Sequence, residues 1–149
     1  YTKNSAVFKS DEYTIYTRLI EGKYFAYQKM FTEGEINTCA SRTALIGAMT
    51  RAKMCTEEKQ PAVFQIEDDV LNISIRDKLA DYQEQVPLQE TVCKSIRLGF
   101  DSRLVLETLK AFTCDNIALG FTSPRTPMIV EAEDSDMKAM VLPVAIREV

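Results

Sequence analysis

The chain has 149 residues, 46% of them hydrophobic, which fits one folded domain, or one domain plus a fragment, and excludes a disordered tail. It contains no histidine, so the commonest general base and the usual Ser-His and Cys-His nucleophile pairs are excluded. Eighteen basic and 22 acidic residues give a net charge of −4, which argues against a surface coated throughout for nucleic acid but leaves room for a local basic face.

The amino-terminal end is predicted to form a hairpin. Two strands are expected over residues 6–9 and 13–19, around a Ser-Asp-Glu turn, and the second is rich in aromatic and β-branched residues. Residues 20–34 follow with a glycine near each end and no clean periodicity. This pattern predicts a packed linker.

From residue 35 onward the same order of elements occurs twice. In the first copy a strand over 36–40 precedes Ser41, a good N-cap residue, and a helix that ends near residue 54. Three strands are then predicted over 62–66, 70–76 and 82–88, with an acidic turn at 67–69.

In the second copy a strand over 95–100 precedes a helix that is capped by Asp101 and Ser102 and ends near residue 112. Three further strands are predicted over 116–121, 128–132 and 138–144. The helices open on Ser41-Arg42 and Ser102-Arg103, 61 residues apart, which indicates an internal βαβββ repeat. Short strands with two helices favour an α+β fold with antiparallel sheets and both helices on one side.

The two predicted helices concentrate positive charge. Together they sum to +4, while the remaining residues sum to −8. Their basic residues are Arg42, Arg51, Lys53, Arg103 and Lys110, against the single acid Glu107. A basic strip on an acidic body would hold a phosphate backbone without reading its sequence. The alternative is that surface helices simply carry soluble side chains.

Four stretches match, in order, the motifs of one family. Residues 17–24, Thr-Arg-Leu-Ile-Glu-Gly-Lys-Tyr, are similar to its R-L-I-E-G-x-Y/F signature, and Leu98-Gly99-Phe100-Asp101 to its G-F-N junction. Residues 104–109 are similar to its Y-L-x-D-x-L helix, and 140–144 to its closing V-M-P-M. The chain thus resembles the bacterial sliding clamp, the beta subunit of DNA polymerase III.

This resemblance implies the DNA clamp fold. Residues 1–20 would be the last two strands of a middle domain, 21–34 the interdomain linker and 35–149 a complete carboxy-terminal domain. Members of the family have three such domains per subunit, and two subunits form a homodimeric ring around duplex DNA, with helices lining the hole. The five basic residues would then face DNA. The resemblance implies a bacterial DNA replication factor for processivity, with no catalysis, cofactor or metal of its own.

The family also holds short linear motifs of the polymerase catalytic subunit, the clamp loader and repair proteins in an apolar groove. The residues that the resemblance carries over to this groove are Phe25, Lys29, Met30, Asp101, Leu104, Pro124, Thr126, Met140, Leu142, Pro143, Val144 and Ile146. Met and Leu side chains suit an adaptable peptide-binding floor. The alternative is that Met140, Leu142 and Val144 are ordinary inward-facing strand residues.

Two other functions stay open. One is a free-standing clamp-like peptide-binding module that does not encircle DNA. The other is an enzyme whose metal ligands are the acids at 67–69 or Glu131, Glu133, Asp134 and Asp136. Both acidic clusters lie in predicted turns, where solvated charge is ordinary, and neither has the spacing of a calcium loop.

The sequence favours a cytoplasmic location. Its apolar runs are too short to span a bilayer, and the first residues lack the apolar segment of a signal peptide. The cysteines, Cys39, Cys55, Cys93 and Cys114, form no C-x-x-C pair, so we expect buried thiols in a reducing compartment.

Overall fold

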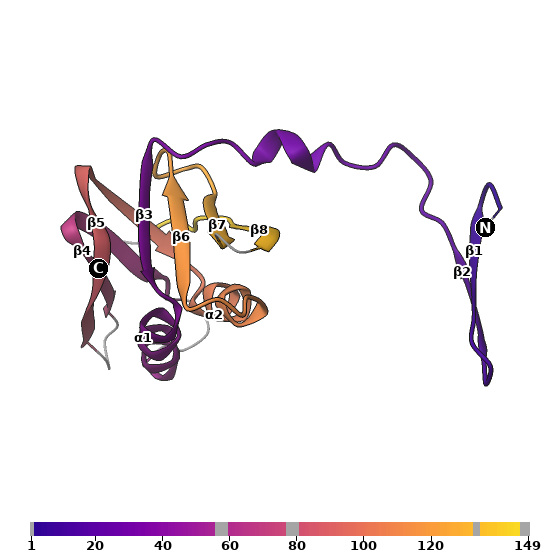
Figure 1. Ribbon diagram of the computed structural model, residues 1–149, viewed down its shortest axis with the longest axis horizontal. Helices are drawn as coiled ribbons and strands as arrows, with labels where there is room; N and C mark the ends of the chain where they lie inside the picture. The colour runs from indigo at the N-terminus through magenta and orange to yellow at the C-terminus, as the bar shows by residue number, and fades with distance from the viewer. Residues whose placement is uncertain (1, 56–59, 77–80, 133–134, 147–149) are drawn as a thin grey trace.

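The computed structural model describes residues 2–55, 60–76, 81–132 and 135–146. It consists of an α+β body, an extended linker and a two-stranded hairpin that stands apart from the body (Figure 1). In the hairpin, β1 (Ser5–Lys9) pairs antiparallel with β2 (Thr14–Arg18). The hairpin predicted at this end of the chain is therefore confirmed.

The linker is exposed rather than packed, so that prediction is wrong. Ile20 is 98% exposed and Tyr24 88%, because the linker runs past the body without covering it. Its regular structure is the short 3-10 helix η1 (Tyr27–Met30). Its internal packing is a chain of edge-to-face ring contacts, from Tyr24 to Tyr27 and from Tyr27 to Phe31.

In the residues that the structure describes, the body contains one antiparallel sheet and two helices, as predicted. The strand order is β4-β5-β3-β6-β7-β8. The elements in chain order are β3 (Ile36–Ser41), α1 (Arg42–Met54), β4 (Ala62–Arg76), β5 (Asp81–Phe100), α2 (Ser102–Ala111), β6 (Asn116–Phe121), β7 (Met128–Ala132) and β8 (Ser135–Val141).

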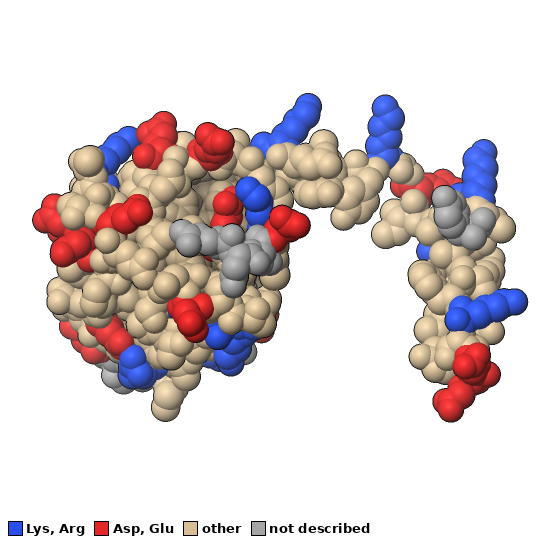
Figure 2. All heavy atoms as spheres, in the orientation of Figure 1, with Lys and Arg blue, Asp and Glu red and all other residues tan. Residues whose placement is uncertain are grey.

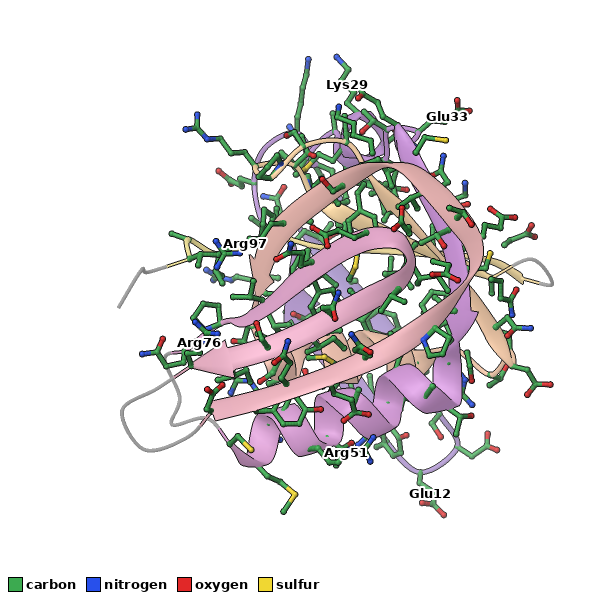
Figure 3. All side chains as sticks on the ribbon, turned by 90° about the vertical axis from the view of Figure 1, so that its left-hand side faces the viewer. Glu12, Lys29, Glu33, Arg51, Arg76 and Arg97 are labelled. Carbon is green, nitrogen blue, oxygen red and sulfur yellow. The ribbon has the colours of Figure 1, made fainter. Side chains whose placement is uncertain are left out.

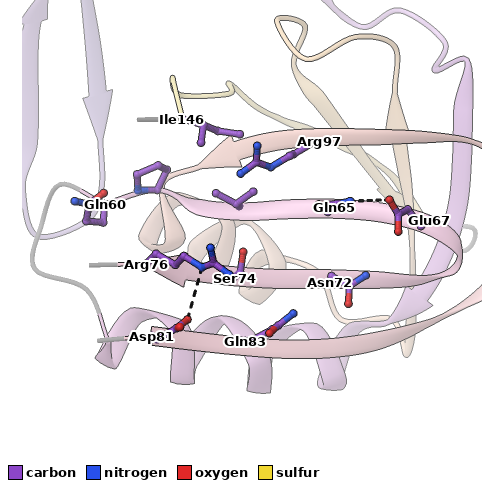
Figure 4. A pocket seen from close by; sticks show the side chains of 12 residues that line it. Gln60, Gln65, Glu67, Asn72, Ser74, Arg76, Asp81, Gln83, Arg97 and Ile146 are labelled. Carbon is purple, nitrogen blue, oxygen red and sulfur yellow. Dashed lines mark hydrogen bonds and ion pairs between the residues drawn. The ribbon is translucent and has the colours of Figure 1, made fainter. Parts of the chain in front are cut away.

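Strands β4 and β5 each unite two of the predicted strands. The chain of β4 folds back at Asp68, whose φ is +53°, inside the predicted acidic turn (Figure 4). Its first half pairs with 96–100 of β5, and its second half with 81–87. Strand β5 runs on without a break between these two stretches, where its Leu88 pairs with Ala40 of β3.

The two copies of the repeat are interlocked. The strand before α1, β3, pairs with the strand after α2, β6, from Ile36 opposite Phe121 to Ser41 opposite Asn116. In the same way, the end of β5, before α2, pairs with the start of β4, after α1, and Ala62 lies opposite Phe100. Each copy therefore supplies a strand to the other half of the sheet.

Helices α1 and α2 lie side by side on one side of the body (Figure 1). Their N-caps are the predicted ones. The Ser41 hydroxyl accepts a hydrogen bond from the Ala44 N–H at 3.3 Å, and the Asp101 carboxylate accepts from the Arg103 and Leu104 N–H groups at 2.8 and 3.4 Å. Each helix turns an apolar face to the core, through Leu45, Ala48, Met49 and Ala52 in α1 and Val105, Leu106 and Leu109 in α2.

The last strand and the cysteines differ from prediction. Strand β8 ends at Val141, not at 144, since Pro143 has no N–H to pair, and Val144 makes only an isolated bridge, donating its N–H to the Gly99 carbonyl at 2.8 Å. The four thiols are not buried: Cys93 is exposed on the outward side of β5, and the others are half-buried. The helices in the described part of the chain lack the length and the apolar character of a membrane-spanning segment.

Candidate nucleic-acid interface

The structure brings the five predicted cations to the two adjacent helices. Lys and Arg side chains lie along the lower edge of the body in Figure 2, where Figure 1 places α1 and α2. Four of the five, Arg51, Lys53, Arg103 and Lys110, are exposed, and Arg42 is half-buried. One flank of a protein with net negative charge therefore carries a group of cations.

On α1 the cations fall on two different sides. Arg42 and Lys53 are eleven residues apart, which places them within about 20° around the helix axis, whereas Arg51 is about 180° away from Arg42. Arg42 faces the loop that follows α2. Its Nε donates to the Cys114 carbonyl at 2.6 Å, and its backbone N–H donates to the Asp115 carbonyl at 2.9 Å. Arg42 therefore ties the start of α1 to the loop after α2.

Arg51 belongs to a polar network with β5. Its Nε donates to Glu84 Oε2 at 2.8 Å and its Nη2 to Glu84 Oε1 at 2.5 Å, and the Tyr82 hydroxyl donates to the Ala48 carbonyl at 2.9 Å or to Glu84 Oε2 at 2.5 Å. The hydrogen bonds from Arg51 and Tyr82 lower the pKa of Glu84 to about 2. Burial and the Glu84 carboxylate raise the pKa of Tyr82, so its hydroxyl stays a donor.

On α2 the cations share one side. Arg103 and Lys110 are seven residues apart, which again places them within about 20° around the axis. Arg103 Nη2 lies 3.9 Å from Asp101 Oδ2, a single long contact, and in the described part of the chain Lys110 makes no ion pair. Glu107 is exposed on the same helix. Both cations are therefore available to a ligand.

The residues carried over to the peptide groove fall into three groups. Asp101 and Leu104 begin α2, where Leu104 is 45% exposed. Met140, Leu142, Pro143, Val144 and Ile146 form the end of β8 and the tail, which runs beside Gly99 at the end of β5. Phe25, Lys29 and Met30 lie on the linker, which Figure 1 shows at the opposite end of the body from the helices.

The remaining two groove residues belong to the turn between β6 and β7. Pro124 is exposed, and the Thr126 hydroxyl accepts from the Ser123 N–H at 2.9 Å, which fixes the turn. Leu142 and Val144 are 57% and 42% exposed, so the alternative that they are inward-facing strand residues is wrong. Met140 is half-buried.

The acidic clusters do not gather into a metal site in the described residues, where no group of three or more possible ligands occurs. Glu67 accepts from Gln65 Nε2 at 2.6 Å, and Glu131 pairs with Lys138 Nζ at 2.8 Å. Glu133 and Asp134 lie outside the described residues. Glu67 and Glu131 are therefore each engaged by a neighbouring side chain of the same sheet.

One surface feature was missed by sequence reasoning. An open hollow of about 680 Å³ lies on the outer side of β4 and β5 and is lined mainly by polar side chains (Figure 4). Its floor consists of the outward residues of these strands, among them Gln65, Asn72, Ser74 and Gln83. The alternation of polar and apolar residues along the strands was the available signal, but it indicates only a solvated face.

The interlocked repeat with two adjacent helices is the fold of DNA sliding clamps. A solved sliding clamp from Caulobacter crescentus superposes with a TM-score of 0.89 at 13% identity and covers 98% of this chain and 40% of that one. A sliding clamp from Bartonella birtlesii, solved bound to griselimycin, gives a TM-score of 0.87 at 15% identity, with 97% and 40% covered. These TM-scores establish the fold.

The sequence establishes the family. The model of the DNA polymerase III beta subunit, C-terminal domain, matches residues 31–145. The curated beta sliding clamp of Halalkalibacterium halodurans is 25% identical over 140 residues, which are 91% of this chain and 37% of that protein. The chain belongs to the DNA polymerase III beta subunit family and spans less than half the length of that relative. The predicted family and fold are thereby confirmed.

Proposed function

We propose that this chain is part of a bacterial, cytoplasmic sliding clamp that encircles duplex DNA and tethers the replicative polymerase, without catalysis, cofactor or metal of its own. The observation that carries the proposal is the pair of adjacent helices with their cations on one flank of an acidic chain of this family. Such a surface attracts phosphates through charge alone and permits sliding, whereas the acidic remainder repels DNA.

The rest of each ring subunit would be formed by the parts of the clamp that this chain does not cover. This chain covers 37–40% of its relatives, so we assign residues 1–20 to the end of a middle domain, 21–34 to the linker and 35–149 to the carboxy-terminal domain. The hairpin supports this assignment, because Phe8, Tyr13 and Tyr16 are 60–67% exposed and an isolated hairpin is at best marginally stable. A homodimer of full-length subunits would complete the ring.

Partner proteins would bind through the apolar groove. Leu104, Leu142 and Val144 are exposed large apolar side chains in the groups that the groove requires, and exposed apolar patches mark interaction sites. The partners are the polymerase catalytic subunit, the clamp loader and repair proteins, each through a short linear motif. The linker residues Phe25 and Lys29 would form the wall nearest the middle domain.

The test is retention on DNA by the full-length protein that contains this chain. We expect the protein, once loaded, to stay on nicked circular DNA and to slide off linear DNA, because the link is topological. Replacing Lys53, Arg103 and Lys110 together with Glu should abolish retention on the circle without unfolding the protein. The matched control replaces three exposed cations away from the helices, Lys3, Lys9 and Lys23, with Glu.

Two outcomes would contradict the proposal. Equal retention on circular and linear DNA would favour the peptide-binding module that does not encircle DNA. Equal loss of retention in the helix variant and in its control would show that total charge, and not the helix surface, holds the DNA.

A further inference from the structure

We infer that the ion pair with Glu84 keeps Arg51 from contacting DNA phosphates, so that Arg51 lies outside the surface that binds the DNA backbone. Arg51 then anchors α1 to β5, and the contact to phosphates falls to Arg42, Lys53, Arg103 and Lys110. This inference rests on the proposed function and divides its five cations into two roles.

The first support is the position of Arg51 around α1. Arg42 and Lys53 lie within about 20° of each other around the helix axis, on the side where Arg42 meets the loop after α2. Arg51 lies about 180° around the axis from them. Figure 3 shows Arg51 where α1 runs along the first part of β5. The Arg51 side chain therefore leaves the helix toward the sheet and away from the other four cations.

The second support is the pairing itself. The guanidinium meets both carboxylate oxygens of Glu84 at 2.8 and 2.5 Å, the bidentate geometry in which an arginine pairs best. The Tyr82 hydroxyl reaches the same carboxylate and the Ala48 carbonyl of α1, so Glu84 is fixed from two directions. The Glu84 side chain is only 26% exposed, against 57% for Arg51.

A phosphate that paired with the Nε–Nη2 edge of Arg51 would have to replace Glu84. Exchange would break two charge-assisted hydrogen bonds of Arg51 and leave the Glu84 carboxylate facing the incoming phosphate, which has the same charge. The lowered pKa of Glu84, about 2, keeps this carboxylate ionised at neutral pH. The positive charge of Arg51 is thus neutralised at short range.

Neither Arg103 nor Arg42 has a bidentate carboxylate partner of this kind. Arg103 has only the 3.9 Å contact with Asp101, whose Oδ1 is already occupied as the N-cap of α2. Arg42 is held by a neutral carbonyl, which leaves its charge uncompensated. The side chains of Arg51 and Arg103 are similarly exposed, at 57% and 62%. They differ in their ion pairs, because Arg51 makes a short bidentate pair and Arg103 a single long contact.

The experiment measures binding of the 149-residue chain to a 20-base-pair duplex by NMR titration at several salt concentrations. The salt slope, meaning the magnitude of the decrease of log K with log salt, falls by about 0.9 for each phosphate contact that is lost. We expect Arg103→Gln and Lys110→Gln each to lower the slope by about this amount and Arg51→Gln to leave it unchanged. Glu84→Gln frees Arg51 and should raise the slope by about 0.9 and the affinity at least about twofold.

The matched control is Glu90→Gln, which removes an equal charge from an exposed residue of the same strand. If Glu84→Gln binds no better than Glu90→Gln, or if Arg51→Gln lowers the slope as Arg103→Gln does, the inference is overturned while the proposed function stands. If Arg103→Gln and Lys110→Gln bind as the wild type does, the helix surface does not hold DNA and both fail. Should Arg51→Gln not fold, the comparison of Glu84→Gln with Glu90→Gln decides, because glutamine still accepts the Tyr82 hydrogen bond.

Discussion

Removal of the Phe100 ring tests whether the interlocked strands hold the body together. Phe100 is fully buried at the end of β5, lies opposite Ala62 of β4, and meets Phe64 edge to face with ring centroids 5.2 Å apart. A buried Phe→Ala change costs about 3–5 kcal/mol, of which about 0.5–1.5 belongs to an aromatic pair. This is a large share of the about 5–15 kcal/mol that stabilises a typical domain.

The assay is urea unfolding of Phe100→Ala, followed by circular dichroism at 222 nm and by tyrosine fluorescence. We expect a lower midpoint with an unchanged m-value and coincident transitions for both signals, because each half of the sheet uses a strand from the other copy. The control is Phe8→Ala, which truncates an identical side chain that is 61% exposed on the hairpin and should cost less than about 0.5 kcal/mol. A loss below about 1 kcal/mol for Phe100→Ala would show that this ring does not hold the interlocked strands together.

Two further predictions concern the network and the groove. Glu84 has a folded-state pKa of about 2 against an ordinary value of 4.5, so its contribution to stability is present above pH 4.5 and disappears as the pH falls toward 2. Urea unfolding should therefore separate wild type from Glu84→Gln most clearly at neutral pH, and a gap that stayed constant down to pH 2 would contradict the ion pair. Leu142→Asp should abolish binding of a fluorescent Gln-Leu-x-Leu-Phe peptide, measured by anisotropy. The same change at Ile20, which is 98% exposed on the linker, should not alter the binding, and equal effects would refute the groove assignment.

Local signals in the sequence predicted much of the fold. Both N-caps, Ser41 and Asp101, hold the hydrogen bonds expected of them, and both helices end within a residue of the predicted positions. The acidic turn at 67–69 reverses the chain at Asp68, as its composition indicates. These features depend on a few neighbouring residues, so a single sequence is enough to locate them.

The same locality explains three wrong predictions. Whether the linker packs, whether the cysteines are buried and where β8 ends all depend on what other segments lie nearby. Ile20 is apolar yet almost fully exposed, and Cys93 points outward from a strand in which Ile96, three residues further on, lies in the core. The tail beyond Val141 is positioned by Gly99, a residue 45 positions before Val144 in the chain.

The repeat, the two capped helices and the segregation of positive charge onto them can be recognised in the amino-acid sequence alone. The exchange of strands between the copies, the side-by-side helices and the pairing of Arg51 with Glu84, 33 residues away in the chain, emerge only in the folded molecule. The two sets of features differ in the range of the interactions that set them. Helix caps and turns are set by hydrogen bonds between residues a few positions apart, whereas strand partners and ion pairs are set by the global packing that buries the two apolar helix faces and the sheet together.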